Sequence, residues 1–377
     1  RRASIGTAAA MAFLNVKDPA TIKIMRKGMI EWGFGAQRAA ADVLGQLPPV
    51  RRRRERPPAT TGKTPAVEQV VHFVNRKLPG RSRLPAKTTR ALLGIENREY
   101  VPIIRDVAKV DEHSDSVFYF PGCGSERLFS QIGLATLAML HDAGARTVMP
   151  PGYLCCGYPQ SSGGDVEKGQ AISTENRVLF HRVANTLNYL DIRTVIVSCG
   201  TCMDQLLKYE FERIFPGCRL LDIHEYLMEK GYALDGVQGT TYVYHDPCHS
   251  PMKTHAPKKV TETLVGQGVT MSDRCCGEAG TFAVARPDIA TQVRVKKAEE
   301  LGRNLAANGV EVGDTAHDVK MLTSCPACVQ GLTRYAGETG IDTDYIVVEL
   351  AKRLLGERWD EEFVARASRG GVEQVLL

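Results

Sequence analysis

Long apolar runs are missing from this sequence, and none reaches the roughly 18 residues that would predict a membrane span. The N-terminus lacks the charged start, apolar centre and small-residue cleavage site of a secretory signal. Cysteine, at 11 of 377 residues, is too sparse for a disulfide-stabilised scaffold. These absences predict a cytoplasmic protein, in whose reducing surroundings clustered cysteines more often serve metal or redox chemistry.

A strong charge imbalance is also absent, since the formal net charge is only +5. Much of it comes from the basic run at 51–56, which prolines flank and which no aromatic residue interrupts. A solvated linker explains this run better than a nucleic-acid-binding arm. We therefore expect no nucleic-acid partner.

The cysteines that are present fall into two sets of five with the same pattern: one Cys, then Cys-Cys-Gly, then Cys-x-x-Cys. The flanking residues repeat as well, as Ser198-Cys199 and Ser324-Cys325 show. The first set is Cys123, Cys155, Cys156, Cys199 and Cys202, and the second is Cys248, Cys275, Cys276, Cys325 and Cys328. One unit has been used twice. Cys218 lies outside the pattern and is interpreted as a buried hydrophobe.

Each set accompanies an alternation of short apolar strands and helices. In the first copy, strands at 117–120, 147–149 and 194–197 alternate with helices near 126–143 and 165–190. The second copy repeats this order from residue 241. Such alternation predicts parallel sheets with right-handed crossovers, and the cysteines would then follow the C-terminal ends of the strands.

We expect an α/β fold of two pseudo-two-fold-related halves with a helical N-terminal arm, in which Ile22, Met25, Met29, Ile30 and Trp32 lie near one face of the helix. The expected segments are a helical arm at 1–47, a Pro/Arg-rich linker at 48–115 that includes short helices at 67–74 and 88–93, the first cysteine domain at 116–235, the second at 236–357 and a polar tail at 358–377. Burial of unpartnered edges would bring the two cysteine-bearing ends to one cleft.

Five sulfurs are one more than a structural zinc site or an ordinary cubane iron–sulfur cluster takes. The surplus predicts either four ligands with a spare redox thiol or a cluster with an unusual ligand count. If both cysteines of each Cys-Cys-Gly bind, that segment has to be a turn, for which Gly157 and Gly277 supply the permissive backbone. Zinc in both sets and a thioredoxin-like dithiol remain alternatives.

The motifs resemble the cysteine-rich CCG domain that occurs in heterodisulfide reductase and in the iron–sulfur subunits of glycolate oxidase. Phe120-Pro121-Gly122-Cys123-Gly124, Leu154-Cys155-Cys156-Gly157-Tyr158-Pro159 and His245-Asp246-Pro247-Cys248-His249 carry the resemblance, which extends over about residues 116–355. It implies that each set holds a noncubane 4Fe–4S cluster. All ten cysteines would then be ligands.

The N-terminal third and the first residue, Arg1, make the chain similar to the C-terminal part of large fusions of an FAD-linked oxidase with an iron–sulfur oxidoreductase. The sequence contains no ferredoxin motif and no clear flavin motif. FAD and a ferredoxin-like dicluster domain are therefore expected on a partner or an upstream domain. Peripheral contact with the inner face of the membrane stays open.

The function that this resemblance implies is an iron–sulfur module that relays electrons from a lactate- or glycolate-type 2-hydroxy-acid dehydrogenase to an acceptor such as quinone. The alternatives are a disulfide reductase acting at the clusters and a zinc-stabilised interaction module. Candidates for hydrogen bonding to sulfur or for proton supply are His245, His249, Arg274 and Glu278, all beside the second set. A strand-end histidine satisfied by the backbone is the alternative interpretation of either His.

Overall fold

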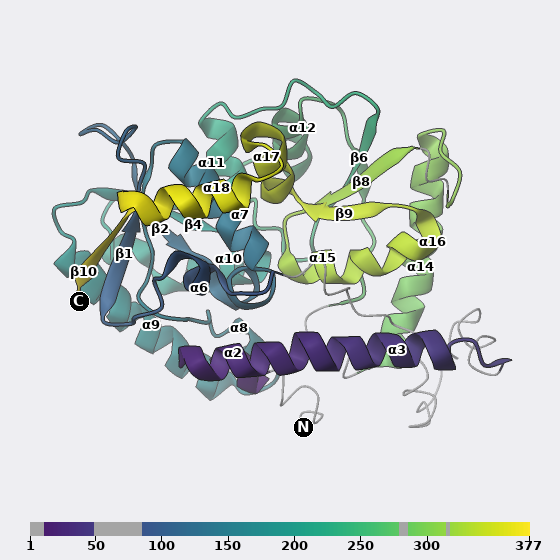
Figure 1. The fold of residues 1–377 in the computed structure, drawn as a ribbon, viewed down its shortest axis with the longest axis horizontal. Coiled ribbons are helices and arrows are strands. Elements are labelled where there is room, and N and C mark those ends of the chain that lie inside the picture. Colours follow the sequence, from purple (N-terminus) through teal and green to yellow (C-terminus); the bar gives the residue numbers. More distant parts are fainter. Residues whose placement is uncertain (1–10, 49–84, 279–285, 314–316) are drawn as a thin grey trace.

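The computed structural model describes residues 11–48, 85–278, 286–313 and 317–377, and it shows two α/β halves side by side (Figure 1). The first half is built on a six-stranded sheet in the order β10-β1-β3-β2-β4-β5. The second is built on a four-stranded sheet in the order β7-β6-β8-β9. Strand order thus repeats between the halves, with β3-β2-β4-β5 matching β7-β6-β8-β9.

Both repeated sheets are parallel, as the sequence predicts. The strands of the first are β2 (Ser116–Phe120), β3 (Arg146–Val148), β4 (Ile192–Val197) and β5 (Arg219–Asp222). Those of the second are β6 (Thr240–His245), β7 (Thr270–Ser272), β8 (Asp318–Thr323) and β9 (Asp342–Tyr345). Every residue of β2 is buried, which is typical of a parallel strand covered on both faces.

The helices that connect these strands also repeat. The first half has η3 (Gly124–Leu128), α7 (Ser130–Asp142), α8 (Tyr158–Ser162), α9 (Val166–Thr186), α10 (Gly200–Leu206), η4 (Leu207–Tyr209), η5 (Phe211–Arg213) and α11 (Ile223–Glu229). The second has α12 (Pro257–Val265), α14 (Pro287–Ala307), α15 (Pro326–Leu332), η6 (Thr333–Tyr335), α16 (Ala336–Thr339) and α17 (Ile346–Leu355). Among the described residues, α7 and α12 are equivalent, and so are α11 and α17.

The halves are joined by an exchange of helices. Helix α17 of the second half packs on α7 of the first, and α11 of the first packs on α12 of the second. The backbone N–H of Val347 donates to Nε2 of His224 at 3.2 Å, while Nδ1 of His224 lies 2.6 Å from Asp222. One hydrophobic core therefore runs through both halves. Helix packing, rather than the pairing of strand edges that we expected, supplies this interface, because each helix turns an apolar face to the opposite half.

The chain end differs from the expected polar tail. Residues after 358 form α18 (Trp359–Arg366), η7 (Ala367–Gly371) and β10 (Val372–Leu376). Strand β10 pairs antiparallel with β1 (Tyr100–Ile104), which in turn pairs with β3. Strand β1 lies within 48–115, where we expected a linker with short helices. Trp359 and Phe363 anchor α18 in the core.

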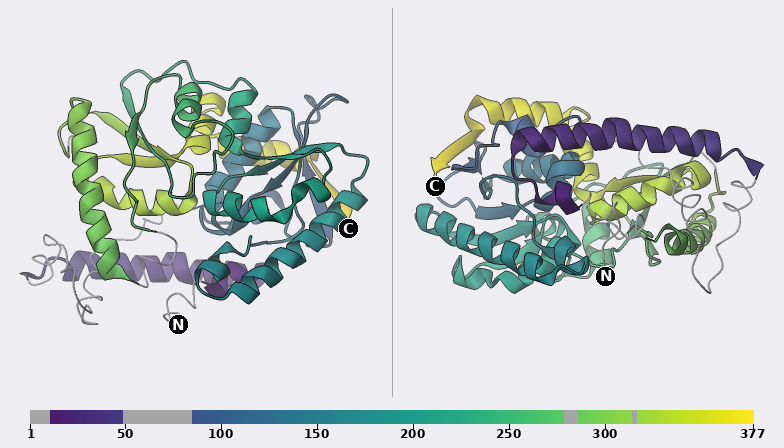
Figure 2. Two further views of the ribbon diagram at one scale, coloured as in Figure 1. Left: turned by 180° about the vertical axis from the view of Figure 1, so that it is seen from behind. Right: turned by 90° about the horizontal axis from the view of Figure 1, so that it is seen from below.

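The N-terminal arm is helical, as expected, and consists of α2 (Pro19–Lys27), η1 (Gly28–Phe34) and α3 (Gly35–Leu44). Figure 2 shows it lying along one side of the molecule. Ile22 and Ile30 are buried, whereas Trp32 is 72% exposed. Trp32 lies in the π-helical turn η1.

Two further expectations on the N-terminal third have different outcomes. The short helix predicted at 88–93 is present as α6 (Thr89–Leu93), capped by the Thr88 side chain. The basic run at 51–56 and the helix predicted at 67–74 lie outside the described residues.

Candidate metal centre

All ten patterned cysteines follow the C-terminal ends of strands, at the edge where α/β sheets place their ligands. Cys199 and Cys325 are the N-cap residues of α10 and α15, so each Cys-x-x-Cys begins a helix whose free N–H groups favour thiolate. The ten residues are Cys123, Cys155, Cys156, Cys199, Cys202, Cys248, Cys275, Cys276, Cys325 and Cys328.

The first set is entirely buried. The sulfurs of Cys155 and Cys123 lie 4.0 Å apart, and the Cys155 sulfur is 3.8 Å from Oε1 of Gln160. Hydrogen bonding also links the thiols of Cys156 and Cys202. Solvent is therefore kept away from this group of sulfurs.

The Cys-Cys-Gly segments are turns, as predicted. Gly157 has φ +89° and Gly277 has φ +78°, both in the left-handed region that glycine tolerates. A Cβ on Gly157 would lie 2.6 Å from the carbonyl oxygen of Gly169. The backbone N–H of Gly277 donates to the Cys275 sulfur at 3.3 Å. Each turn thus directs neighbouring sulfurs toward the other cysteines of its set.

The second set is more open than the first. Cys276 and Cys328 are buried with their sulfurs 3.4 Å apart, but Cys275 is half-buried and Cys248 is exposed. Cys248 and Cys275 are linked by a hydrogen bond between their thiols. Of the two sets, only the second is therefore accessible to a ligand from solvent in the described part of the chain.

The two sets meet at the boundary between the halves. Interaction with Cys199 raises the pKa of the Cys325 thiol, so one cysteine of each set lies near the other at this boundary. Beside them, the Tyr345 hydroxyl lies 2.7 Å from the Ser198 carbonyl oxygen and 3.0 Å from that of Ser324. The expectation that both cysteine-bearing ends turn toward each other is confirmed.

Hydrogen bonding between cysteines of one set shifts the pKa values of their thiols. Hydrogen bonding from Cys248 and then from Cys276 lowers the pKa of Cys275 to about 2, so that a thiolate resides there. In the first set, hydrogen bonding from Cys123 likewise lowers the pKa of Cys155. Arg127, buried next to this pair, favours its thiolate as well. Thiolate is the form in which cysteine binds metals.

His245 joins the second set. One ring nitrogen of His245 and the sulfurs of Cys276 and Cys328 all lie within 4.8 Å of one another. Burial first, and the Lys297 ammonium second, lower the pKa of His245 to about 4, which keeps the ring neutral. Nδ1 is 3.1 Å from the Ser272 carbonyl oxygen and 3.2 Å from Nζ of Lys297, and Nε2 has no hydrogen-bond partner among the described residues. In the tautomer whose Nδ1–H donates to Ser272, the Nε2 lone pair is available to a metal.

His249 connects the halves instead. Its Nδ1 lies 2.5 Å from Oδ2 of Asp204, and its Nε2 lies 2.9 Å from the Tyr158 hydroxyl. Both partners belong to the first half. Asp204 lies just after the Cys-x-x-Cys motif, and Tyr158 follows the Cys-Cys-Gly motif. Lys253 pairs with the other oxygen of Asp204 at 2.9 Å. The backbone-satisfied histidine considered from sequence is therefore not the arrangement of His249.

The other charged candidates are engaged away from a common surface. Glu278 is buried in a pair with Arg334 at 2.9 Å, and Gln330 donates to it at 2.7 Å. The Arg274 guanidinium donates to the Lys296 carbonyl oxygen at 3.3 Å. Two further cations near the cysteines are also engaged: Arg127 is buried, and Lys253 pairs with Asp204 at 2.9 Å.

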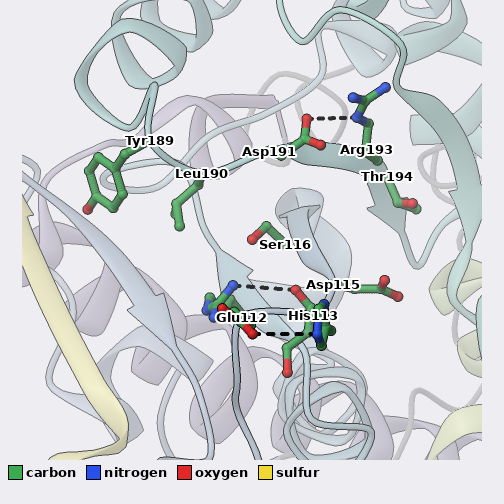
Figure 3. Close-up of a pocket in the computed structure, with 11 residues that line it drawn as sticks. Glu112, His113, Asp115, Ser116, Tyr189, Leu190, Asp191, Arg193 and Thr194 are labelled. Atoms are coloured by element: carbon green, nitrogen blue, oxygen red, sulfur yellow. Dashed lines mark hydrogen bonds and ion pairs between the residues drawn. The ribbon is translucent and has the colours of Figure 1, made fainter.

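A polar hollow lies at the opposite edge of the first sheet, where β2 and β4 begin (Figure 3). Its volume is about 300 Å³, and its lining includes His113, Arg146, Tyr189 and Arg193. None of its lining residues is a cysteine. Within the described residues, the group of side chains that could hold a metal ion, His245 with Cys276 and Cys328, lies at the edge that carries the two sets.

Comparison with protein families identifies the repeated unit. The model of a cysteine-rich domain, CCG, matches residues 117–207 and again residues 242–332, and each match contains one set of five cysteines. The chain contains two CCG cysteine-rich domains. A domain of unknown function, DUF3400, matches residues 333–377, the segment that ends in α18 and β10.

Curated relatives with this domain include proteins with iron–sulfur names. An uncharacterized iron-sulfur protein of Methanococcus maripaludis is 24% identical over 69% of this chain and 50% of its own. The fumarate reductase (CoM/CoB) of Methanothermobacter marburgensis has a subunit that is 28% identical over 56% of this chain and 40% of its own. A probable glycolate oxidase iron-sulfur subunit of Bacillus subtilis is 25% identical over 63% of this chain and 54% of its own.

The matches of the first two of these relatives span only half of their length or less. No solved structure matches this chain. Within the described residues, every helix is too short or too polar to cross a bilayer.

Proposed function

We propose that the protein is the iron–sulfur module of an oxidoreductase, with one 4Fe–4S cluster of the noncubane type on each set of five cysteines. The names of its relatives and the two complete donor sets support this assignment. A bound cluster would supply one-electron oxidation and reduction. Thiolate at Cys155 and Cys275 and the lone pair of His245 fit such a group.

The residues of the chain would shape this chemistry in two ways. Around the first set, burial excludes water, which shifts the reduction potential and protects the sulfurs. Around the second set, the exposed Cys248 leaves one side open to a partner or substrate. The two centres would thus differ in surroundings although their ligand patterns are the same.

The observation that carries the electron-transfer proposal is the meeting of the Ser198-Cys199 and Ser324-Cys325 segments at the Tyr345 hydroxyl, which lies within hydrogen-bond distance of the carbonyl oxygens of Ser198 and Ser324. Because one cysteine of each set takes part, electrons could pass between the sets in single steps. A flavin that has oxidised a 2-hydroxy acid by two electrons needs such a path. We assign the donor, an FAD-linked lactate- or glycolate-type dehydrogenase, and a ferredoxin-like dicluster domain to a partner or another part of a longer chain. The acceptor would be a quinone or a similar carrier, reached from the cytoplasm, with contact at the inner face of the membrane.

A second candidate is disulfide reduction at the open set. It is favoured by the exposure of Cys248 next to His249, whose ring is held by Asp204 and Tyr158. A substrate sulfur could approach Cys248 there.

Metal analysis of anaerobically purified protein tests the proposal. We expect about eight irons and a similar amount of acid-labile sulfide per chain, with paramagnetic signals from both centres on reduction. Zinc without sulfide would overturn the proposal in favour of an interaction module. Reoxidation of the reduced protein by a low-molecular-weight disulfide, but not by a quinone, would favour the second candidate.

A further inference from the structure

A cavity of about 1100 Å³ lies between the N-terminal arm and the first half. One wall is formed by α2 and the start of η1, and the other by the segment that leads into α6. Much of its lining is apolar: Pro19, Ala20, Ile22, Ile30, Pro85 and Ala91. The metal-binding proposal does not use this cavity.

The lining of the cavity also includes polar side chains, one of which is close in sequence to the first cysteine set. Tyr153 lines it, two residues before Cys155. The Tyr153 hydroxyl donates to Oε1 of Glu96 at 2.8 Å and lies 2.6 Å from the Thr88 hydroxyl. The Tyr153 ring faces the Arg127 guanidinium, 5.5 Å from the ring centroid. Arg127 belongs to η3, whose N-cap residue is Cys123. One aromatic ring and one guanidinium thus connect the cavity to the first set.

Basic side chains surround the cavity. Lys23, Lys27 and Lys87 line it and are exposed, so their ammonium groups can donate hydrogen bonds to a ligand at its mouth. Arg26 lines it as well, but its guanidinium already donates to the carbonyl oxygens of Arg127 at 2.7 Å and Ala86 at 2.9 Å. Arg26 therefore fixes the wall, while the three lysines remain the donors at the rim.

The size and lining of the cavity exclude a small hydroxy acid as its ligand. Ligand sites of this volume typically bury most of a drug-sized molecule, with apolar walls and a few polar groups that orient it. A short, anionic acid would leave most of these walls without contact. An apolar molecule with oxygen acceptors would instead match both the walls and the lysines.

We infer that this cavity binds a quinone, an apolar two-electron carrier with carbonyl oxygens, as the acceptor for the first cysteine set. This rests on the proposed electron-transfer function. The quinone would take two electrons, delivered one at a time from the centre held by the first set, and two protons from the water at the lysine-lined mouth. Its two carbonyl groups would become the hydroxyl groups of the quinol, and the centre would return to its oxidised state.

Calorimetric titration of the full chain with a decyl-substituted benzoquinone tests the inference directly. Ala91→Trp and, separately, Ala20→Trp would each fill the cavity from one wall, and each should weaken binding by at least about ten-fold. Val178→Trp is the matched control, because Val178 is an exposed position of α9 outside the cavity lining. Circular dichroism and iron content would show that each variant is folded and loaded.

The outcomes separate this inference from the proposed function. No binding by the unmodified protein, equal binding by both cavity variants, or equal affinity for a decyl-benzene without carbonyl groups would each overturn the quinone site. Loss of binding in both cavity variants, with unchanged affinity in Val178→Trp, would support it. Since binding is measured without turnover, a protein that lacks iron but binds quinone in this way would refute the proposed function alone.

Discussion

Nδ1 of His249 and Oδ2 of Asp204 lie 2.5 Å apart across the boundary between the two halves. His249 follows Cys248, and Asp204 lies shortly after Cys202. Their contact therefore links the positions of the two cysteine sets. The Tyr158 hydroxyl lies 2.9 Å from Nε2 of His249, and Nζ of Lys253 lies 2.9 Å from Oδ1 of Asp204. A change at either residue should therefore affect the joint between the halves before it affects the core of either half.

A double-mutant cycle measures this joint. Asp204→Asn and His249→Gln should each lower the free energy of unfolding, with a coupling energy of about 1 kcal/mol, because the pair is partly screened by solvent. The control cycle uses Asp191 and Arg193, a pair of exposed residues within the first half. We expect almost no coupling there. Equal coupling energies in urea unfolding of both pairs would contradict a special role for His249.

The Cys-Cys-Gly cysteines give a prediction on ligand number. If both members bind, Cys156→Ser and Cys276→Ser should each disturb one cluster and lower the iron content from about eight toward about four per chain. Cys218→Ser is the control, because Cys218 is packed against the core of the first half, outside both sets. Full iron content and an unchanged spectrum in either test variant would show that its cysteine is not a ligand.

Tyr345→Phe removes the hydroxyl group that lies between Ser198, after β4, and Ser324, after β8. The carbonyl oxygens of Ser198 and Ser324 would lose this donor in a buried place, which should lower the free energy of unfolding by about 1–3 kcal/mol. Tyr189→Phe, at a largely exposed tyrosine, should change it little. Chemical denaturation under anaerobic conditions gives both values, and similar small losses would show that the shared hydrogen bond is unimportant.

His141 predicts how stability depends on pH. Burial lowers its pKa, while Asp106 opposes this and Arg366 and Lys109 reinforce it. Below an unfolded-state pKa of about 6.5, the unfolded chain gains a proton that the folded protein does not take up. Stability should therefore be full above that pH and fall as the pH drops, by at most about 1.4 kcal/mol per pH unit from this residue.

Replacement of His141 isolates this contribution from those of other titrating groups. His141→Leu should unfold with a flatter pH dependence between about pH 6.5 and 5 than the unmodified protein. His113→Gln, at a side chain that is 85% exposed, is the control and should keep the original slope. Identical slopes in all three proteins would contradict the prediction.

The repeated pattern of cysteines predicts much of the fold and the site, because short-range signals determine both. Apolar runs such as 117–120 become buried strands, and glycines 157 and 277 take the positive φ that a turn needs. The strand-end positions of the cysteines then follow from parallel topology. Their role as ligands stays a prediction, as do the cluster type and the domain boundaries.

Features that depend on contacts between distant segments are harder to infer. The pairing of β10 with β1 joins residues near the chain end to residues near 100, and neither segment has a local pattern that names its partner. Similarly, Asp204 and Tyr158 carried no signal that links them to His249. Their only hint is that each follows a cysteine motif within a few residues.

Tyr345 ends β9, and the equivalent position at the end of β5 is Asp222. A symmetrical dimer of two first halves would have Asp222 at both of these positions, whereas the chain has one Asp and one Tyr. In such a dimer, neither Ser198 carbonyl oxygen would accept a hydrogen bond from a tyrosine hydroxyl. A dimer of two second halves would bring two Tyr345 hydroxyl groups to the boundary, where the chain has one. The duplicated units are thus complementary rather than interchangeable at this contact, which requires one of each.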